Sequence, residues 1–574
     1  MTEKILSRAQ ISDLIAQGKV IVIFKNNVLN LTGWLKYHPG GDKAVYHMVG
    51  RDATDEMLAY HSEESISAFS RWKIGSINYE WHNLLPPIQG AVYTIGMAGK
   101  LSPNDDTLGK LLDTESPYML KSEQSSMTSL EADTVTVPVN PNYTRAGYPE
   151  GKVEPVVPQN IEVVTAENKD DLFPVMKSVV VDPKELMREF DNQLTRRDLF
   201  DLPSMDYTTQ NSIREKYNQL HARIIKKGLY KCNYGDYVRE IVKISSLFLY
   251  SFSFLKLGYY FLSAIFIGMA WQQMTFIAHD AGHISITHNF QIDNIFGMII
   301  ADWFGGLSLG WWKRNHNVHH LITNDPVHDP DIQHLPFFAV STRLFGDVYS
   351  TYYEKVLWFD AFCKKLIPFQ EFMYYPLLAF GRFNLYRLSW THLILGQGPR
   401  HGKAAWFRYF ELAGLSFFFY WFFVLVVGSV EGTWNKISYV LVSHICTMIV
   451  HVQITLSHFA MSTSDLGVSE SFPSRQMRTT MDVDCPVWFD FFHGGLQFQA
   501  IHHLFPRLPR HNLRRAQADV IEFCEEVGLP YSIYGFGKGN EIVIGKLAEI
   551  GKQCSIMLDC TRKMKEDQVP ITLD

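Results

Sequence analysis

H-D-A-G-H at residues 279–283 is followed by N-H-N-V-H-H at 315–320 and, far along the chain, by Q-A-I-H-H at 499–503. Residues three or four positions apart share one face of a helix, so each motif can present its imidazoles in one direction. The candidate ligands are His279, His283, His316, His319, His320, His502 and His503. One zinc ion takes at most four protein ligands, so this set exceeds a single zinc site and indicates two metal ions. Imidazole donors in this number suit redox-active iron.

Two simpler interpretations explain the motifs less well. A lone histidine near a membrane surface is usually a hydrogen-bonded polar group, but here each motif directly precedes or follows a long apolar segment. A zinc protease helix needs a glutamate after its first histidine to act as the base, and this position is Asp280. The grouping therefore favours a metal centre beside a membrane.

The apolar segments predict about four membrane crossings. Residues 241–278 are apolar apart from a break at 256–258, and one helix spans the hydrocarbon in about 20 residues, so they indicate two spans with a tight turn. Residues 409–428 and 437–459 predict two more spans. The run at 292–311 contains two aspartates and leads directly into the second motif. We expect this run to return without crossing, or to lie in the interface.

The charges between the spans predict which side of the membrane the motifs occupy. Residues 313–406 are rich in Lys and Arg, which favours the cytosolic side, and four crossings return the chain to its starting side. The first residues contain no apolar core of signal-peptide length. We therefore expect the N-terminus and all three motifs on the cytosolic face. His458, at the cytosolic end of the last span, is a candidate eighth ligand.

Composition and patterning divide the rest of the chain. The 574 residues carry a net charge of −6, so no basic excess indicates nucleic acid, and the seven cysteines contain no C-x-x-C pair. Residues 100–170 lack periodicity and predict a linker. We expect four regions, which are an N-terminal domain at 1–78, a linker and cytosolic helical segment at 79–235, a membrane domain at 236–530 and a cytosolic tail at 531–574.

The N-terminal region carries two histidines in a pattern of its own. V-I-V-I-F-K-N-N-V-L-N-L-T at 20–32 predicts a β-hairpin with the Asn pair in its turn. H-P-G-G at 38–41 follows, and H-S at 61–62 begins twenty-three residues after His38. These motifs resemble the haem-binding turns of cytochrome b5 over all of 1–78. The resemblance implies one haem b with His38 and His61 as axial ligands, which leaves no open position for oxygen and suits electron transfer.

The three histidine motifs resemble those of the membrane fatty-acyl desaturases over about 240–530. That family carries H-x-x-x-H, H-x-x-H-H and H-x-x-H-H, and here Gln499 replaces the first histidine of the third motif. This replacement, together with a fused cytochrome b5 domain, marks the front-end desaturases, which act between an existing functional group and the polar end of a lipid chain. Residues 316–336 and 491–513 look most like those of the fungal sphingolipid Δ8 desaturases.

The resemblance implies a fold and a chemistry. The fold is an α+β cytochrome b5-like domain followed by an all-α integral membrane domain with about four transmembrane helices and a cytosolic cap. Two non-haem iron ions would be held by the seven histidines and His458, with Gln499 in or beside the ligand set. Asp280 and Asp329 could orient imidazoles. The haem domain, tethered by the linker, would deliver electrons to this centre.

The same resemblance implies a substrate, partners and a location. The sphingoid long-chain base of ceramides would gain a mainly trans double bond at C8, with O2 as the oxidant. An NADH-cytochrome b5 reductase would supply the electrons, and the protein would lie in the endoplasmic reticulum membrane. Three alternatives stay open, which are a Δ5 or Δ6 acyl-lipid desaturase, a lipid hydroxylase, and a membrane-tethered electron carrier in which only His38 and His61 matter.

Overall fold

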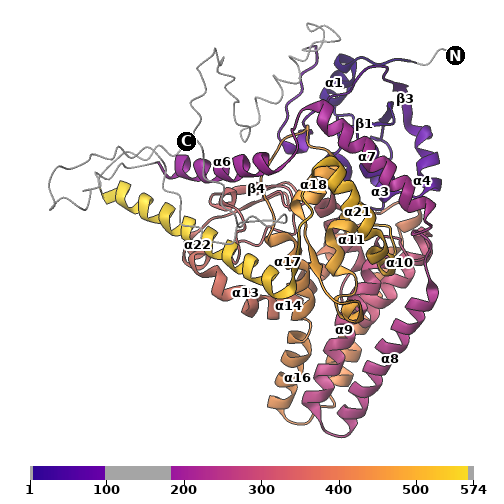
Figure 1. Cartoon of the computed structure of the whole chain (residues 1–574). Helices are drawn as coiled ribbons and strands as arrows, with labels where there is room; N and C mark the ends of the chain where they lie inside the picture. Colours follow the sequence, from indigo (N-terminus) through magenta and orange to yellow (C-terminus); the bar gives the residue numbers. More distant parts are fainter. Residues whose placement is uncertain (1–3, 97–181, 567–574) are drawn as a thin grey trace.

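The structure is a computed structural model of the whole chain, and it describes residues 4–96 and 182–566. The part of the expected linker at 97–181 lies outside the described residues. The N-terminal domain sits at one side of a layer of helices, and long apolar helices project from the other side of that layer (Figure 1).

The N-terminal domain has the expected α+β fold. Its antiparallel sheet has the order β1 (Ile21–Phe24), β2 (Asn27–Asn30) and β3 (Lys73–Ser76). Its helices are α1 (Arg8–Ala16), α2 (Asp42–Tyr46), α3 (Thr54–Tyr60) and α4 (Glu63–Ala68). Trp81 and Leu84 are buried in the same core, so the domain extends past the predicted boundary at residue 78.

The predicted hairpin is present, but its turn lies one residue earlier than expected. Phe24 pairs with Asn27, which leaves Lys25 and Asn26 as the turn, with φ of 47° and 62°. Two successive residues with positive φ form the turn whose twist matches the flanking strands. Asn27 is already the first residue of β2, so it needs no positive φ.

The helices after the N-terminal domain include an antiparallel pair, α8 (Tyr234–Lys256) and α9 (Tyr260–Gly282), which a tight turn joins at Gly258 with φ of 78°. Within the described residues, three helices are long and apolar enough to cross a membrane, and they are Tyr260–Gly282, Gly402–Val426 and Thr433–Phe459. The α8 helix, predicted as a span, is not among them because its first turns are charged. It nevertheless packs along α9 (Figure 1).

The run predicted to return without crossing is bent. The helical stretch 290–304, made of α10 (Phe290–Met298) and a π-helical turn, meets α11 (Leu309–Leu321) at an angle of 115°. Counted as one span, this bent pair would be the fourth apolar crossing of the described chain. The bend places the second histidine motif, on α11, beside the end of α9.

The remaining elements build the layer between the apolar helices and the N-terminal domain, or complete the spans. The helices are α6 (Pro183–Asp201), α7 (Tyr207–Lys226), α12 (Ala361–Leu366), α13 (Gln370–Ala379), α14 (Gly381–Leu395), α15 (Phe407–Phe419), α16 (Thr433–Ile445), α17 (Met448–Phe459), α18 (Phe472–Thr479), α19 (Asp490–His493), α20 (Gln499–Leu504), α21 (Leu513–Val527) and α22 (Phe536–Glu566). The short strands are β4 (Val348–Ser350) with β5 (Lys355–Leu357), and β6 (Asp482–Asp484) with β7 (Ile533–Gly535).

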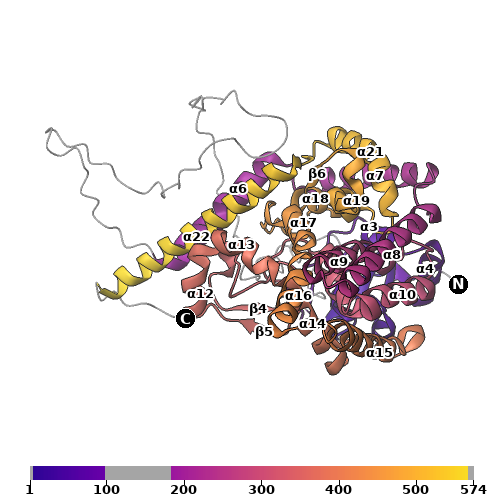
Figure 2. The ribbon, with the colours of Figure 1, turned by 90° about the horizontal axis from the view of Figure 1, so that it is seen from below.

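The C-terminal segment differs from the tail predicted for 531–574. Its described part forms β7, which pairs in parallel with β6, and then the 31-residue helix α22. The α22 helix runs beside α6 and packs on α13 and α17 (Figure 2). Buried residues recur along it at helical spacing, namely Val543, Leu547, Ile550 and Cys554. Such an apolar stripe packs a helix against a core, so the described part of this segment is folded against the rest of the chain.

Candidate metal centre and haem site

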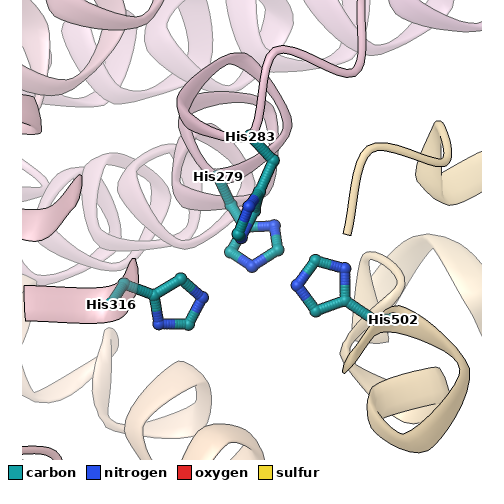
Figure 3. Close-up of side chains that lie close together, drawn as sticks. All are labelled: His279, His283, His316 and His502. Carbon is teal, nitrogen blue, oxygen red and sulfur yellow. The ribbon is translucent and has the colours of Figure 1, made fainter. Parts of the chain in front are cut away.

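The three histidine motifs, far apart in sequence, meet at one place. The first lies at the C-terminal end of α9, the second on α11 and the third on α20. One group comprises His279, His283, His316 and His502, whose ligand nitrogens lie within 4.8 Å of one another. Their imidazoles converge from α9, α11 and α20 on a common point (Figure 3). The ring centroids of His279 and His502 are 4.6 Å apart.

A second group forms beside the first. It comprises His319, His503 and His458, again with ligand nitrogens within 4.8 Å of one another. The ring of His458, from the last apolar helix, lies 4.5 Å from that of His319. The structure thus places the candidate eighth histidine with residues of the second and third motifs.

His320 lies between the two groups. Its ring stacks on His503 with centroids 4.0 Å apart, and its Nε2 lies 3.0 Å from Nε2 of His316. All seven histidines of the motifs are therefore gathered in one buried region. A third grouping, His316 and His319 with Asp331, overlaps both.

The nitrogen atoms of these groups fit metal ions. Five buried ring nitrogens of this site have no hydrogen-bond partner among the described residues. They are His283 Nε2, His320 Nδ1, His458 Nδ1, His502 Nε2 and His503 Nε2. Buried polar atoms are rarely left unsatisfied, and a metal ion would satisfy them. Burial, reinforced by the neighbouring histidines, holds the pKa of His502 and of His503 well below the ordinary value. These imidazoles are therefore neutral, which is the form that binds a metal.

Two polar side chains orient the second group from outside. Asp329 accepts a hydrogen bond from His319 Nδ1 at 2.8 Å and another from the Asn324 backbone N–H at 2.8 Å. Gln476 Oε1 lies 2.9 Å from His503 Nδ1, and its Nε2 donates to the carbonyl of His320 at 2.7 Å. Such contacts fix which ring nitrogen is free for a metal. Asp329 was predicted, whereas Gln476 lies in a polar stretch that gave no signal.

Asp280 has a different role from the predicted one. Its nearest approach to His279 Nδ1 is 3.7 Å, which is too long for a hydrogen bond. Its carboxylate instead accepts from the Tyr237 hydroxyl at 2.5 Å and pairs with Arg510. As the next residue on the helix, Asp280 points about 100° away from His279. It therefore ties α9 to α8 and to the segment after the third motif.

Two further residues lie on the helices that carry the histidine groups. Gln499 is buried on the first turn of α20, belongs to none of the histidine groups, and its Oε1 finds no partner in the described part of the chain. The ring of Trp312 stacks on His316 with centroids 4.4 Å apart. A Cβ at Gly282 would lie 2.1 Å from Trp312, so only glycine in H-D-A-G-H admits this ring.

The two histidines of the N-terminal domain face a common space. The ring centroids of His38 and His61 are 6.3 Å apart. Their Nδ1 atoms bond the carbonyls of Gly41 at 2.6 Å and Met57 at 3.0 Å, which leaves each Nε2 for a metal. Burial and the nearby His38 lower the pKa of His61 to about 3, so it stays neutral. The ring of Phe69 packs on His61. These residues fit the axial ligation of a haem.

Two family profiles match the chain. Residues 257–535 match the family described as "Fatty acid desaturase", and residues 7–86 match "Cytochrome b5-like Heme/Steroid binding domain". The two matched regions contain both sets of histidines described above.

Curated proteins resemble the chain over its whole length. A "Delta 8-(E)-sphingolipid desaturase" of Candida albicans is 65% identical, over 98% of this chain and 99% of that protein. A protein of the same description from Lachancea kluyveri is 58% identical, over 98% of this chain and 96% of that protein. An "Acyl-lipid (9-3)-desaturase" of Borago officinalis is 33% identical over 63% of this chain and 80% of that protein.

Proposed function

The chain belongs to the fatty acid desaturase family, among the members that carry an N-terminal cytochrome b5-like domain, and we propose that it introduces an 8-E double bond into the sphingoid long-chain base of ceramides. One observation carries the proposal, namely 65% identity over nearly the full length of a "Delta 8-(E)-sphingolipid desaturase". The likeness to an acyl-lipid desaturase covers only 63% of the chain.

The proposed reaction removes two hydrogen atoms from adjacent CH2 groups and leaves a trans alkene. Dioxygen accepts four electrons, two with the lipid hydrogens and two from the haem domain, and with two protons becomes two molecules of water. A pair of iron ions would supply the oxidant that an unactivated C–H bond requires. A haem held by both His38 and His61 would supply electron transfer, one electron at a time.

The residues have separate tasks in this proposal. One iron would be held by His279, His283, His316 and His502, and the other by His319, His458 and His503, with His320 between them. Asp329 and Gln476 orient two of these rings through hydrogen bonds. Gln499, the first residue of the third motif, has a buried amide oxygen and is a further candidate ligand. One haem b would be bound between His38 and His61.

The electron donor and the location are proposed from the chemistry. A reductase that oxidises NADH would reduce the haem domain. Helix α11, which carries the second histidine motif, and α3, which ends at His61, lie at the same end of the long apolar helices (Figure 1). Residues 313–406 are rich in Lys and Arg. Such segments favour the cytosolic face, so we place the active site on the cytosolic side of the endoplasmic reticulum membrane.

Lipid profiling tests the substrate directly. A yeast strain without such an enzyme would express the chain or its His319→Ala variant, and sphingoid bases and fatty acids would be measured by mass spectrometry. We expect a Δ8 base with the unaltered chain and none with the variant. New fatty acids with unchanged bases would favour a Δ5 or Δ6 acyl desaturase, a hydroxylated base would favour a hydroxylase, and no lipid change would return the electron carrier as an explanation.

A further inference from the structure

We propose that α11, besides holding metal, docks the haem domain beside the histidine groups. Its positioning residues are Arg314 and Asn317, which hold the first haem-binding turn. Arg507, beyond the third motif, is the positioning residue that holds the second turn. The inference rests on the proposed function, because it concerns how electrons enter the same centre. The sequence predicts a domain that reaches the centre on a tether, whereas the contacts indicate a fixed dock.

The first haem-binding turn is held by the helix of the second motif. Asn317 Nδ2 donates to the carbonyl of Gly40 at 3.1 Å, and Arg314 pairs with Asp42 at 3.1 Å. A Cβ at Gly40 would lie 2.9 Å from the Asn317 side chain, and one at Gly41 would lie 3.1 Å from Arg314. The glycines of H-P-G-G therefore admit the close approach of α11 as well as shaping the turn.

The α11 helix has two faces with different partners. One face meets the other histidine motifs, and its residues are His316, His319 and His320. The other face meets the haem domain, and its residues are Arg314, Asn317, Val318 and Leu321. With 3.6 residues per turn these two sets fall on opposite sides of the helix. Val318 packs in a cluster with Ala44 of the haem domain, and Leu321 packs on that domain's core.

The second haem-binding turn is held by the segment after the third motif. Arg507, four residues beyond His503, donates to the carbonyl of His61 at 2.8 Å. The residue before that histidine, Tyr60, has its ring 6.0 Å from the ring of His320 at an interplanar angle of 80°. A side chain next to one axial position thus contacts the histidine that lies between the two metal groups.

Ion pairs surround these central contacts. Arg214 of α7 bonds Asp52 at 2.6 Å and Asp55 at 3.0 Å, and the side chain of Asp55 is only 1% exposed. Lys43 pairs with Glu354, which precedes β5. Several ion pairs on separate elements specify one orientation, which a flexible tether would not do. The dock therefore sets one short route by which each of the two electrons of a turnover leaves the haem domain.

Zero-length crosslinking tests the dock without requiring turnover. A water-soluble carbodiimide joins an amine to a carboxylate that it contacts, so in the full-length protein in nanodiscs we expect a peptide that links Lys43 to Glu354. A matched control is the pair Lys216 with Glu526, which joins α7 to α21 and does not involve the haem domain. Both peptides are quantified by mass spectrometry in the same sample.

A charge-reversal cycle identifies the positioning role. We expect Arg314→Glu and Asp42→Arg each to lower the yield of the Lys43 to Glu354 crosslink about fivefold, the effect of roughly 1 kcal/mol, and the double variant to restore it. The Lys216 to Glu526 yield and the haem absorbance of Arg314→Glu should stay unchanged. An interdomain yield that is absent in the parent protein, or equal in parent and single variants, would overturn the proposal.

The contact between Tyr60 and His320 has its own measurement. Haem reduced with dithionite is mixed with oxygen, and its reoxidation is followed by absorbance, with His319→Ala as the background for direct oxidation. We expect a rate independent of protein concentration, slowed about fivefold in Tyr60→Leu and preserved in Tyr60→Phe. If haem reoxidation is equally fast in Tyr60→Leu and Tyr60→Phe, the aromatic ring of Tyr60 has no part in the electron-transfer route. Lipid products are measured separately, so failure of the dock and failure of the substrate assignment are distinguishable.

Discussion

The rings of the sequence neighbours His502 and His503 lie 6.0 Å apart at an interplanar angle of 85°, and each belongs to a different histidine group. The second motif divides in the same way, since His316 joins the first group and His319 the second. Histidines one or three residues apart thus let one short helix contribute to both histidine groups. A displacement of the helix that carries either motif would therefore move histidines of both groups.

Replacing one histidine of a doublet should remove mainly one metal. We expect His503→Ala to lower bound iron from about two per chain to about one, and His502→Ala to do the same at the other group. Iron is measured by plasma mass spectrometry on purified protein. The exposed His401 lies in neither group, so His401→Ala should keep the full iron content.

His458 should behave as a ligand and its helix neighbour should not. His458→Ala is expected to lose iron and all desaturation, because the ring lies 4.5 Å from His319. His451, seven residues earlier on α17, packs against Gly381 instead, so His451→Ala should retain iron. Equal iron loss in the two variants would show that damage to α17, and not ligation, causes the effect.

Asp329 should tune the metal without binding it. Asp329→Asn removes the charge that orients His319, and loss of such an outer contact typically costs 10–100-fold in metal affinity or activity, so we expect about that effect here. Chelator titration measures the affinity. The matched change Asp347→Asn, at a carboxylate that accepts a hydrogen bond from the Phe359 N–H away from the histidine groups, should have no effect on iron.

Haem binding should depend on two histidines of the N-terminal domain and not on a third. His38→Ala and His61→Ala are each expected to abolish the haem absorbance while iron at the other centre is retained. His47 is fully buried in the same domain but packs on His328, so His47→Asn should still bind haem. Haem retained in His61→Ala would refute the axial assignment.

Glu56 of α3 should make the haem domain less stable at high pH. Burial raises its pKa from 4.5 to about 7, with Arg51 and Arg214 opposing the shift and Asp55 adding to it. The stabilisation is complete below pH 4.5, where the carboxyl is protonated in both states, and is lost as the pH rises to 7. The total is roughly 3 kcal/mol.

The neutral substitution Glu56→Gln tests this dependence. The temperature of haem release, followed by absorbance, should fall between pH 5 and pH 8 in the parent protein, and the fall should be smaller in the variant. An equal fall in both proteins would assign the pH dependence to another group.

The histidine pattern was sufficient to predict which residues meet at this site, whereas their binding of metal stays a prediction. All seven motif histidines and His458 lie together, because spacings of three and four residues on helices leave few other arrangements. The division into two groups was not predictable, since it depends on how α9, α11 and α20 cross. The same holds for Gln476, which approaches His503 only through the packing of α18.

Other differences arise where distant residues decide local structure. The charged start of α8 is typical of the flank of a membrane span. In the structure, Tyr237 there bonds Asp280, and Glu240 bonds Arg510 and His511. The stretch after residue 531 reads as a polar tail, because its buried stripe is diluted by charged residues on the other face of α22. Neither pairing can be inferred from one sequence.

The pairing of β6 with β7 bears on the order in which the protein is made. Asp482 of β6 accepts a hydrogen bond from the N–H of Ala500 at 2.8 Å, so this strand supports the third motif, and its partner strand is not synthesised until residue 535. The ribosome must therefore synthesise nearly the whole polypeptide before β6, and with it the third motif, has all of its contacts. We therefore expect iron to bind late in biogenesis, and we expect a cell short of iron to accumulate an inserted apoprotein.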